Sequence, residues 1–306
     1  LKQLDMPDYS SEILPPPPSI KSETVSNPPK INPIAKLVMK LIGMKWNRAG
    51  ISFSQNDMER MLNKFWQVNS ESSLLRWGLT EEETKALVTK CREKQVTVNS
   101  ALWTAFLIAQ REIQGDQASF RKMAGMAIST REKLTFPVGE EFGFFASSMS
   151  LKFDCNLELP FWDSARTIHK EIKEAVGKTD LFRMLVTERL PPSLLDSFYF
   201  AKYDGFQNKL ATKMLKQMNW DKVSYGYSIT NVGRVDIETE FGSRTIQSIY
   251  GPLLYSDVNE KVVGITTVNG QLTFSMTAST NNVSQNEMNG IRNRVMDLIF
   301  KEISGE

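Results

Sequence analysis

The sequence is poor in the residues on which many active sites depend. Its 306 residues include one histidine, His169, and two cysteines, Cys91 and Cys155, which lie far apart in the chain. A zinc site takes several closely placed His and Cys ligands, so the sequence predicts no metal site of this kind. Two separated thiols are typical of reduced core residues, and we therefore expect a cytoplasmic location.

Long apolar runs and blocks of one charge are also missing. No uninterrupted apolar stretch reaches the roughly 18 to 20 residues that span a bilayer, so we predict no transmembrane segment. The 37 basic and 35 acidic residues leave a net charge of +2, without the Lys and Arg clusters that indicate nucleic-acid binding. Glycine-rich phosphate-binding loops are absent as well. With 41% hydrophobic residues, the composition is that of a globular protein.

Proline is concentrated at the start of the chain, where the first 33 residues hold eight of the 13 prolines. Because proline fixes its own φ and lacks a backbone donor, this stretch predicts an extended connector that crosses a surface. The chain begins at Leu1 with neither an initiator Met nor a signal-peptide pattern. We therefore expect it to be part of a longer product.

Residues 34–45 have the spacing of an amphipathic helix, with Ile34, Val38 and Leu41 on one side and lysines among them. A basic amphipathic helix can bind a membrane surface. The commoner arrangement is a helix packed on its domain with its lysines in water, and we expect that one here. We assign residues 1–71 to a proline-rich crossover with amphipathic helices, and residues 72–306 to the main lobe.

From Ser72 onward the pattern becomes regular. Thr80 and Glu83 form a capping box, Asn269-Gly270 is a hairpin signal, and Ser284 caps a final helix. This mixture predicts an α/β (α+β) layered fold, in which helices flank a mixed sheet. Strands are predicted at 72–79, 120–131, 145–153, 223–230, 244–250, 262–268 and 272–278, and helices at 80–94, 97–113, 161–176, 181–190, 208–217 and 287–303.

Two features could indicate a catalytic residue, a nucleophile-elbow pattern and the single histidine, but the sequence supports neither. Residues 226–230 approach a nucleophile elbow, but Thr230 replaces the second glycine that the tight turn requires. His169 lies beside the apolar stripe of its predicted helix, in line with Arg166 and Lys173, so we expect it to face solvent. A general base would instead be held in a cleft and oriented by a partner. The chain therefore offers no histidine base of its own.

Several segments, taken in order, resemble one enzyme superfamily. Their order and spacing are similar to those of the chloramphenicol-acetyltransferase-like superfamily, in its branch of alcohol acetyltransferases and condensation domains. Phe144 and Thr230 depart from this pattern, because Asn and Ser are commoner there. The matching segments are Leu79-Thr80-Glu81-Glu82-Glu83-Thr84, Cys91-Arg92-Glu93-Lys94, Val96-Thr97-Val98-Asn99-Ser100-Ala101-Leu102, Ala127-Ile128-Ser129-Thr130-Arg131, Phe142-Gly143-Phe144-Phe145-Ala146-Ser147 and Tyr227-Ser228-Ile229-Thr230-Asn231-Val232-Gly233-Arg234-Val235.

The resemblance, which covers residues 72–306, implies an acyltransferase. Such enzymes move an acyl group from a thioester, on coenzyme A or a carrier protein, to a hydroxyl or amine acceptor. Their base is the second histidine of a His-His-x-x-x-Asp-Gly motif, at the junction of two lobes that enclose a tunnel. That motif belongs before a proline-rich crossover like residues 13–33, and His169 is the chain's one histidine. We therefore expect this chain to be the second lobe, with the base on a preceding lobe or a partner chain.

The resemblance also suggests which side chains face the tunnel. Ser228, Thr230 and Asn231 are candidates for the oxyanion side of the site, because donors must face the oxygen that becomes charged. Alternation along the strand would place Ser228 and Thr230 on one face and Asn231 on the other. The alternative is that Asn231 and Gly233 simply form the turn that ends the strand.

Aromatic residues supply the candidates for an apolar acyl channel, although core packing is the commoner role for such side chains. Arg131 and the two glycines of the motifs are expected to support the fold. The tunnel candidates are Phe144, Phe145, Tyr225 and Tyr227, and the structural candidates are Arg131, Gly143 and Gly233.

Three hypotheses remain open on the sequence alone. The chain is part of an acyltransferase with its base outside these residues, one of two chains of a split enzyme, or a non-catalytic binding and scaffold module. No resident cofactor is expected, since the acyl thioester is a co-substrate. The sequence does not identify the small-molecule acceptor or the acyl chain.

Overall fold

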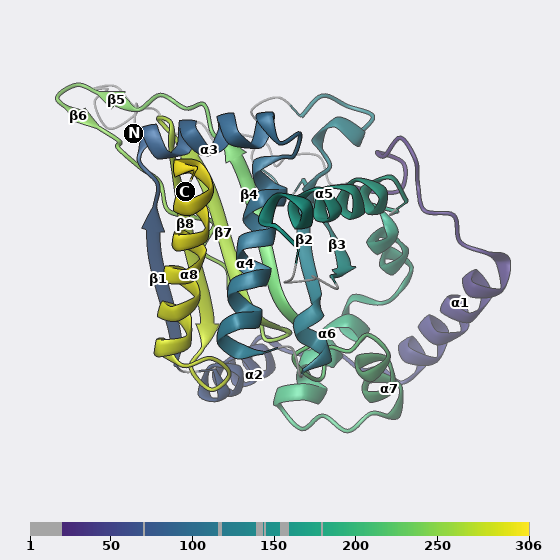
Figure 1. The fold of residues 1–306 in the computed structure, drawn as a ribbon. Helices are drawn as coiled ribbons and strands as arrows, with labels where there is room; N and C mark the ends of the chain where they lie inside the picture. Colours follow the sequence, from purple (N-terminus) through teal and green to yellow (C-terminus); the bar gives the residue numbers. More distant parts are fainter. Residues whose placement is uncertain are drawn as a thin grey trace.

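A six-stranded mixed sheet forms the centre of the molecule, as a computed structural model shows (Figure 1). The predicted α/β class is confirmed. The strands are β1 (Ser72–Gly78), β2 (Met123–Ser129), β3 (Ala146–Lys152), β4 (Tyr225–Arg234), β7 (Asn259–Val268) and β8 (Gln271–Ser279), in the order β1-β8-β7-β4-β2-β3. The structure describes residues 20–69, 71–115, 118–138, 143, 145–153, 159–178 and 180–305.

The strands β2, β4 and β7 are parallel to one another. β3 pairs antiparallel with β2, β8 pairs antiparallel with β7, and β1 pairs antiparallel with β8. β7 and β8 form the predicted hairpin at Asn269-Gly270, where Val268 pairs with Gln271. Both turn residues have positive φ, 49° for Asn269 and 76° for Gly270. A two-residue turn of this kind needs that backbone, and Asn and Gly adopt it most readily.

Four helices cover one face of the sheet: α3 (Glu81–Glu93), α4 (Val98–Gln114), α5 (Phe161–Lys178) and α8 (Gln285–Ser304) (Figure 1). The predicted capping boxes are present, since Thr80 begins α3 and Ser284 begins α8. Every residue of α4 from Ser100 to Gln110 is buried. We call this the helix-covered face, and the main apolar core fills it.

A separate helical layer packs beside the sheet, formed by α1 (Pro33–Arg48), α2 (Gln55–Val68), α6 (Pro192–Tyr203) and α7 (Lys209–Gln217). Trp46 of α1 shares an apolar cluster with Phe198 of α6 and Leu215 of α7. α1, from the predicted crossover segment (residues 1–71), therefore packs against helices of the predicted main lobe (residues 72–306). α6 has no counterpart among the predicted helices, because its apolar residues lack a clear helical stripe.

An irregular segment, residues 246–258, crosses the opposite face of the sheet, and we call it the strap. Its carbonyl oxygens accept hydrogen bonds from hydroxyl side chains of β7 and β8. Thr266 donates to Gly251 at 2.5 Å, Thr273 to Ile249 at 2.5 Å and Ser275 to Pro252 at 3.1 Å, and Thr277 donates to Leu254. Between Ile249 and Leu254, β7 and β8 therefore hold the strap through their hydroxyl side chains.

The strap corrects the predicted strand at 244–250, which is wrong beyond Thr245. Only Arg244–Thr245 is extended, as β6, and it pairs with β5 (Glu240–Phe241) in a small projecting hairpin. After β6, the backbone oxygens are taken by hydroxyls of the central sheet. A pattern of alternating apolar residues does not distinguish this arrangement from a strand.

Three other predicted elements differ from the structure. The strand at 120–131 is shorter, because the 3-10 turns Ser119–Lys122 and Arg131–Lys133 flank β2. The helix at 181–190 is instead the 3-10 segment η4 (Arg183–Arg189). The strand at 223–230 continues to Arg234 through a bulge.

Candidate functional site

A cleft of about 790 Å³ lies on the sheet face that the helices leave uncovered, and we call it the outer cleft. Ala124 and Met126 of β2 face the helix-covered core, so the alternating Gly125 and Ala127 face the opposite side. A Cβ on Gly125 would lie 3.3 Å from the Ser228 hydroxyl oxygen. Because the side chains on this face are small, they project only a short distance from the sheet and leave room for a ligand.

The described lining of the cleft is mainly apolar, with hydroxyl groups in a minority. Part of it is a second small apolar cluster, formed by Phe145 and Phe182 with Val25 and Leu134. The apolar lining residues are Ile20, Ala127, Phe145, Ala146, Leu181, Phe182, Met184, Leu185 and Leu254, and the hydroxyl-bearing ones are Thr130, Ser147, Ser148 and Thr230. Such a surface suits an apolar ligand that carries a few polar atoms.

The position of the outer cleft follows from the sheet topology. Ala127 and Thr130 mark the carboxyl end of β2, and Thr230 lies in the second half of the parallel neighbour β4. In open α/β sheets, ligands commonly bind near the carboxyl ends of parallel strands. The strap supplies the facing wall through Leu254.

Thr130 is the most unusual polar residue of the lining. Its side chain is 1% exposed, and its hydroxyl oxygen lacks a hydrogen-bond partner among the described residues. Its backbone N–H donates to the Phe145 carbonyl at 2.9 Å. An unpaired buried hydroxyl costs about 1 to 3 kcal/mol.

Neither Asp, Glu, Lys, Arg, His nor Cys appears among the described lining residues. The described part of the chain also contains no group of His, Cys, Asp and Glu that could hold a metal ion. None of its helices is long and apolar enough to cross a bilayer. The described lining can bind and orient a neutral substrate, but it offers no side chain that would take up a proton near neutral pH.

Three of the sequence candidates line the outer cleft. They are Thr230, Gly143 and Phe145, which come from β4 and from the segment before β3. Phe144 lies outside the described residues. The guanidinium carbon of Arg131 lies 4.8 Å from the centre of the Phe145 ring, so Arg131 contacts a residue of the cleft lining.

Asn231 and Gly233 form a bulge inside β4 instead of a turn at its end. The pairing of β4 with β7 shifts register between them, and Gly233 has a φ of 77°. The Asn231 side-chain oxygen accepts from the Gly233 N–H at 2.8 Å, and its amide donates to Asn99 at 3.4 Å. Asn231 is thus engaged on the side of α4, whereas Thr230 lines the cleft.

The two tyrosine candidates lie away from the cleft lining. Tyr227 is fully buried in the main core, where its ring meets Phe106 edge-on at 5.7 Å. Tyr227 therefore packs under the helices, which corrects its assignment to a tunnel wall. The Tyr225 hydroxyl accepts from Ser150 at 3.1 Å and joins β4 to the edge strand β3.

His169 is half-buried, which corrects the expected solvent-facing position. Its Nδ1 lies 3.2 Å from the Ser100 hydroxyl, which in turn lies 2.7 Å from the Thr97 hydroxyl. The difference arises because α5 packs across the start of α4, so the edge of its apolar stripe is covered. His169 lies on the helix-covered face and does not line the outer cleft.

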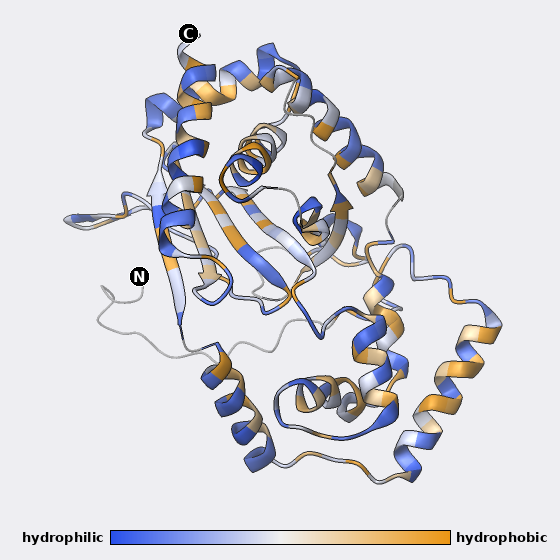
Figure 2. Ribbon diagram, turned by 60° about the horizontal axis from the view of Figure 1, so that its bottom comes forward, coloured by the Kyte–Doolittle hydropathy of each residue, from blue (hydrophilic) through white to orange (hydrophobic). Residues whose placement is uncertain are grey.

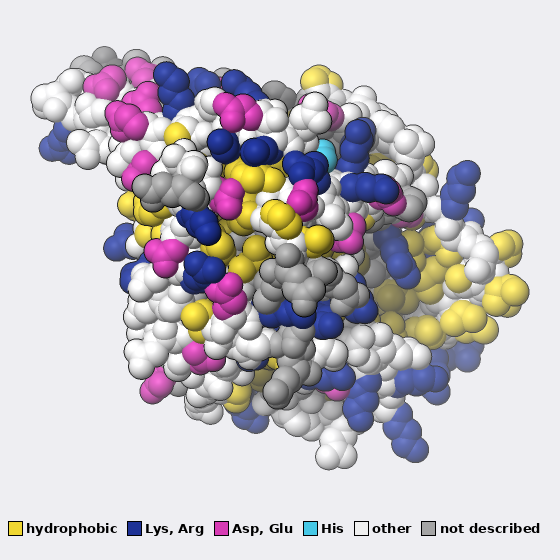
Figure 3. Space-filling view, in the orientation of Figure 1, with side chains coloured by type: hydrophobic (Ala, Val, Ile, Leu, Met, Phe, Trp, Pro, Cys, Tyr) yellow, Lys and Arg dark blue, Asp and Glu magenta, His cyan; other side chains and the backbone are white. Residues whose placement is uncertain are grey.

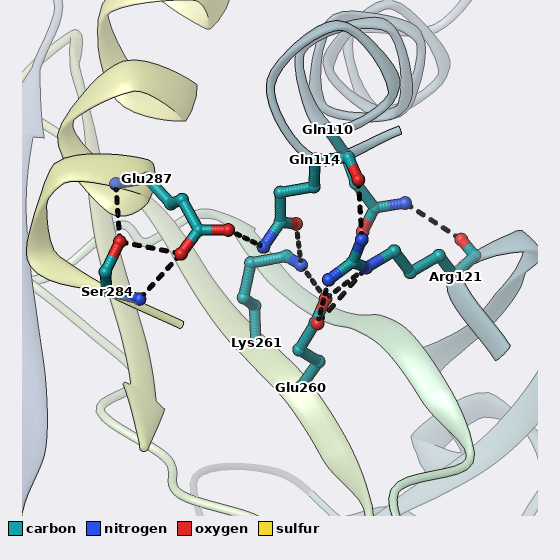
Figure 4. Close-up of polar contacts among 7 residues, drawn as sticks. All are labelled: Gln110, Gln114, Arg121, Glu260, Lys261, Ser284 and Glu287. Carbon is teal, nitrogen blue, oxygen red and sulfur yellow. Dashed lines mark hydrogen bonds and ion pairs between the residues drawn. The ribbon is translucent and has the colours of Figure 1, made fainter. Parts of the chain in front are cut away.

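A buried ionic network lies at the other end of the sheet (Figure 4). Lys261, which is fully buried, binds the Glu260 carboxylate and the Gln114 side-chain oxygen at 2.7 Å. Glu260 also binds Arg121 at 2.8 Å. Burial lowers the pKa of Lys261 to about 8, while the Glu260 carboxylate opposes this shift.

The network joins α4, α8, β7 and the 3-10 turn that carries Arg121, and it has a structural role. Gln114 of α4 donates to Glu287 at 3.3 Å, and Glu287 is the capping-box carboxylate of α8 (Figure 4). The Lys261 ammonium lies 4.6 Å from the centre of the Tyr227 ring. Because the charged groups bind one another, they fasten α4 and α8 to the amino-terminal end of β7.

Sequence reasoning missed both Thr130 and the Glu260–Lys261 pair. Thr130 stands beside Arg131 in the quoted motif, but nothing in the sequence marks its hydroxyl as buried and unpaired. The charged pair precedes an apolar strand, a position that is usually exposed. The signal in the sequence was an acidic and a basic residue next to each other at the start of a strand, which could have indicated a buried ion pair.

No family model matches this sequence, and no curated protein matches it significantly. Solved structures do match its fold. The epimerization domain from the third module of tyrocidine synthetase B aligns with a TM-score of 0.54 and 14% identity, over 78% of this chain and 49% of that chain. Trichothecene 15-O-acetyltransferase from Fusarium sporotrichioides aligns with a TM-score of 0.53 and 10% identity, over 82% of this chain and 53% of that chain.

A condensation-domain structure, which concerns chain release from the enacyloxin polyketide synthase, aligns with a TM-score of 0.50 and 14% identity over 76% of this chain. The alignment covers 41% of that chain, so this sequence spans about half or less of the structures it matches. At these identities the likeness shows the fold alone. It confirms the predicted fold, a mixed sheet flanked by helices, as these condensation and acetyltransferase structures have it.

Proposed function

We propose that this chain forms one wall of the substrate channel of an acyltransferase, which moves an acyl group from a thioester to a hydroxyl or amine acceptor. The premise is the fold that it shares with condensation and acetyltransferase structures. The observation that carries the proposal is the outer cleft, whose described lining combines apolar side chains, hydroxyls and no ionisable group. The base would come from a preceding lobe or a partner chain.

In the proposed reaction, a histidine outside these residues takes the proton of the acceptor as the acceptor attacks the thioester carbonyl. The carbonyl oxygen then carries the negative charge of the tetrahedral intermediate. When the carbon–sulfur bond breaks, the thiolate leaves and receives the proton from the imidazolium. The products are an ester or amide and a free thiol, so atoms and charge balance.

The role of these residues would be to hold the acyl chain and stabilise the oxyanion. Thr230 is the candidate donor, because its side chain lines the cleft, whereas Asn231 already has partners in the bulge. The Thr130 hydroxyl, which lacks a partner among the described residues, would be a second donor. Donors that are fixed before the reaction stabilise a developing charge most effectively.

The acyl donor would be a co-substrate, either acyl-coenzyme A or an acyl-loaded carrier protein. We place the reaction in the cytoplasm on the basis of the cysteine content. Cys91 is buried, and burial raises the pKa of its thiol to about 12, so it would remain a protonated core residue at neutral pH. It therefore has no role in the proposed acyl transfer.

The test uses the natural gene product that contains these residues. It is incubated with acyl-coenzyme A donors or acyl-loaded carrier protein, together with small alcohols and amines, and free thiol release is measured. We expect release that depends on the acceptor, with kcat/KM lowered up to roughly a hundredfold in Thr230→Val. The matched control is Thr245→Val on the projecting hairpin, where the hydroxyl bonds Glu240 and the rate should not change.

The outcomes separate the competing hypotheses. Binding of the acyl thioester without turnover would favour a non-catalytic scaffold module. Turnover that appears only after a second chain is added would identify a split enzyme. If Thr230→Val and the unaltered protein turn over at equal rates, the Thr230 hydroxyl does not take part in the reaction.

A further inference from the structure

Helix α1 has two apolar sides, and only one of them is covered. The covered side includes Ile42, Gly43 and Trp46, which face the helical layer. The Trp46 indole N–H donates to the Ser193 hydroxyl at 2.9 Å and fixes the helix against the start of α6. Figure 2 shows α1 at the edge of the molecule, with apolar residues along its length.

The uncovered side consists of large apolar side chains that nothing in the described structure contacts closely enough to bury. They are Ile34 at 75% exposure, Leu37 at 57%, Val38 at 47%, Leu41 at 51% and Met44 at 40%. At 100° per residue they fall within an arc of about 120°, and they run along about 15 Å of helix. We call these five residues the α1 stripe, and Figure 3 shows an apolar surface at the place of α1.

The charge of α1 has one sign. Its sixteen residues include Lys36, Lys40, Lys45 and Arg48 and no Asp or Glu. All four basic side chains are exposed. By helical spacing, Lys40 borders the α1 stripe and Lys36 lies beyond it, next to the covered side, while Lys45 and Arg48 fall within the arc of the stripe at the C-terminal end.

This combination discriminates between two kinds of partner. The core of a protein–protein interface is depleted in lysine, because the ammonium group would lose its water. At a membrane surface, lysine side chains extend to the lipid headgroups while the apolar side chains enter the acyl boundary. Lysines within and beside the stripe therefore favour a lipid surface over a protein groove.

We propose that α1 binds the surface of an anionic lipid membrane, with the α1 stripe buried at the headgroup boundary and its four basic side chains on the phosphates. The helix would lie flat on the membrane, since it is too short to cross one. Membrane attachment would bring an apolar substrate near the molecule, but the proposal is independent of acyl transfer.

The test is co-sedimentation of the natural gene product with vesicles. We expect binding to phosphatidylcholine vesicles that contain phosphatidylserine, little binding to pure phosphatidylcholine, and weaker binding at high salt. Leu37→Glu with Leu41→Glu should lower the partition coefficient at least about tenfold, since two charges would enter the boundary. Lys36→Gln with Lys40→Gln should lower it on anionic vesicles alone, by roughly tenfold.

Leu62→Glu is the matched control, because Leu62 of α2 is 48% exposed and lies outside the α1 stripe. Its binding should equal that of the unaltered protein, and circular dichroism melts should coincide for all variants. The lysine pair keeps the test valid if the glutamate pair perturbs folding. Equal binding to neutral and anionic vesicles, or unaltered binding by the lysine pair, would overturn the proposal. So would an oligomer that the glutamate pair converts to monomer without any vesicle binding, since that result identifies a protein interface.

Discussion

The two faces of the central sheet carry different side chains. One face supplies most of the packing that stabilises the fold, and the other forms the candidate binding site. The helix-covered face is filled by large apolar side chains such as Phe106 and Phe274, which are fully buried. The outer face carries small residues and hydroxyls, and its hydrogen bonds go to the strap. Dense packing makes the helix-covered face rigid. On the outer face, the small side chains leave the space that forms the cleft.

The largest effect on stability should follow from emptying the helix-covered face. Phe106 contacts the rings of Trp77, Tyr227 and Phe274 at the centre of the core. Phe106→Ala should lower the free energy of unfolding by about 3 to 5 kcal/mol, because the cavity cannot collapse. Urea denaturation measures this loss. A loss below 1 kcal/mol would show that the core is not packed as described.

On the outer face, the close approach of the strap should give the next largest effect. A Cβ at Gly264 would collide with the Pro252 carbonyl oxygen. Gly264→Ala should cost about 1 to 3 kcal/mol, because the strap must move. Gly177→Ala is the control, since nothing lies within 4 Å of its added Cβ on the exposed side of α5, and it should be neutral or slightly stabilising. Equal melting temperatures for the two variants would show that the strap does not lie close to Gly264.

The buried network should make stability depend on pH. The pKa of Lys261 is about 8 in the folded protein and 10.5 in the unfolded chain, so between these values the unfolded chain binds more protons. The free energy of unfolding should therefore rise with pH relative to Lys261→Met, by up to about 1.4 kcal/mol per pH unit. Below pH 8 the difference between the two proteins should be constant. Urea titrations at several pH values test this, and a constant difference up to pH 10 would contradict it.

The smallest effect on stability should come from the cleft itself. Thr130→Val replaces a buried hydroxyl, which has no partner in the described part of the chain, with a methyl group, and should raise the free energy of unfolding by about 1 kcal/mol. The same change should slow acyl transfer in the natural gene product. A variant that is less stable and fully active would mean that Thr130 has a partner in the fold and no role in the cleft.

Local signals predicted much of the fold. The capping boxes at Thr80 and Ser284, the Asn269-Gly270 turn and the apolar content of α4 each act within a few residues, so the chain alone determines them. The cleft depends on distant contacts. The strap accepts hydrogen bonds from strands up to 24 residues away, as Thr273 to Ile249 illustrates, and no local pattern indicates such a pair.

The candidate site was predictable only in part. Thr230, Gly143 and Phe145 follow from the resemblance and line the cleft, whereas Tyr227 was assigned to the wrong side of the sheet. In β4, Tyr227 and Ile229 face the core and Thr230 faces the cleft, and alternation alone does not say which set is which. The covering helices decide it, and their placement is a tertiary property.

The most direct test of the account is to fill the outer cleft. Ala127→Trp in the natural gene product would place an indole in the cleft, while Val232→Trp adds the same group at an exposed position of β4. We predict that Ala127→Trp abolishes acyl-acceptor-dependent thiol release and still unfolds cooperatively, and that Val232→Trp keeps the unaltered rate. Thiol release by folded Ala127→Trp at the unaltered rate would show that the substrate lies elsewhere.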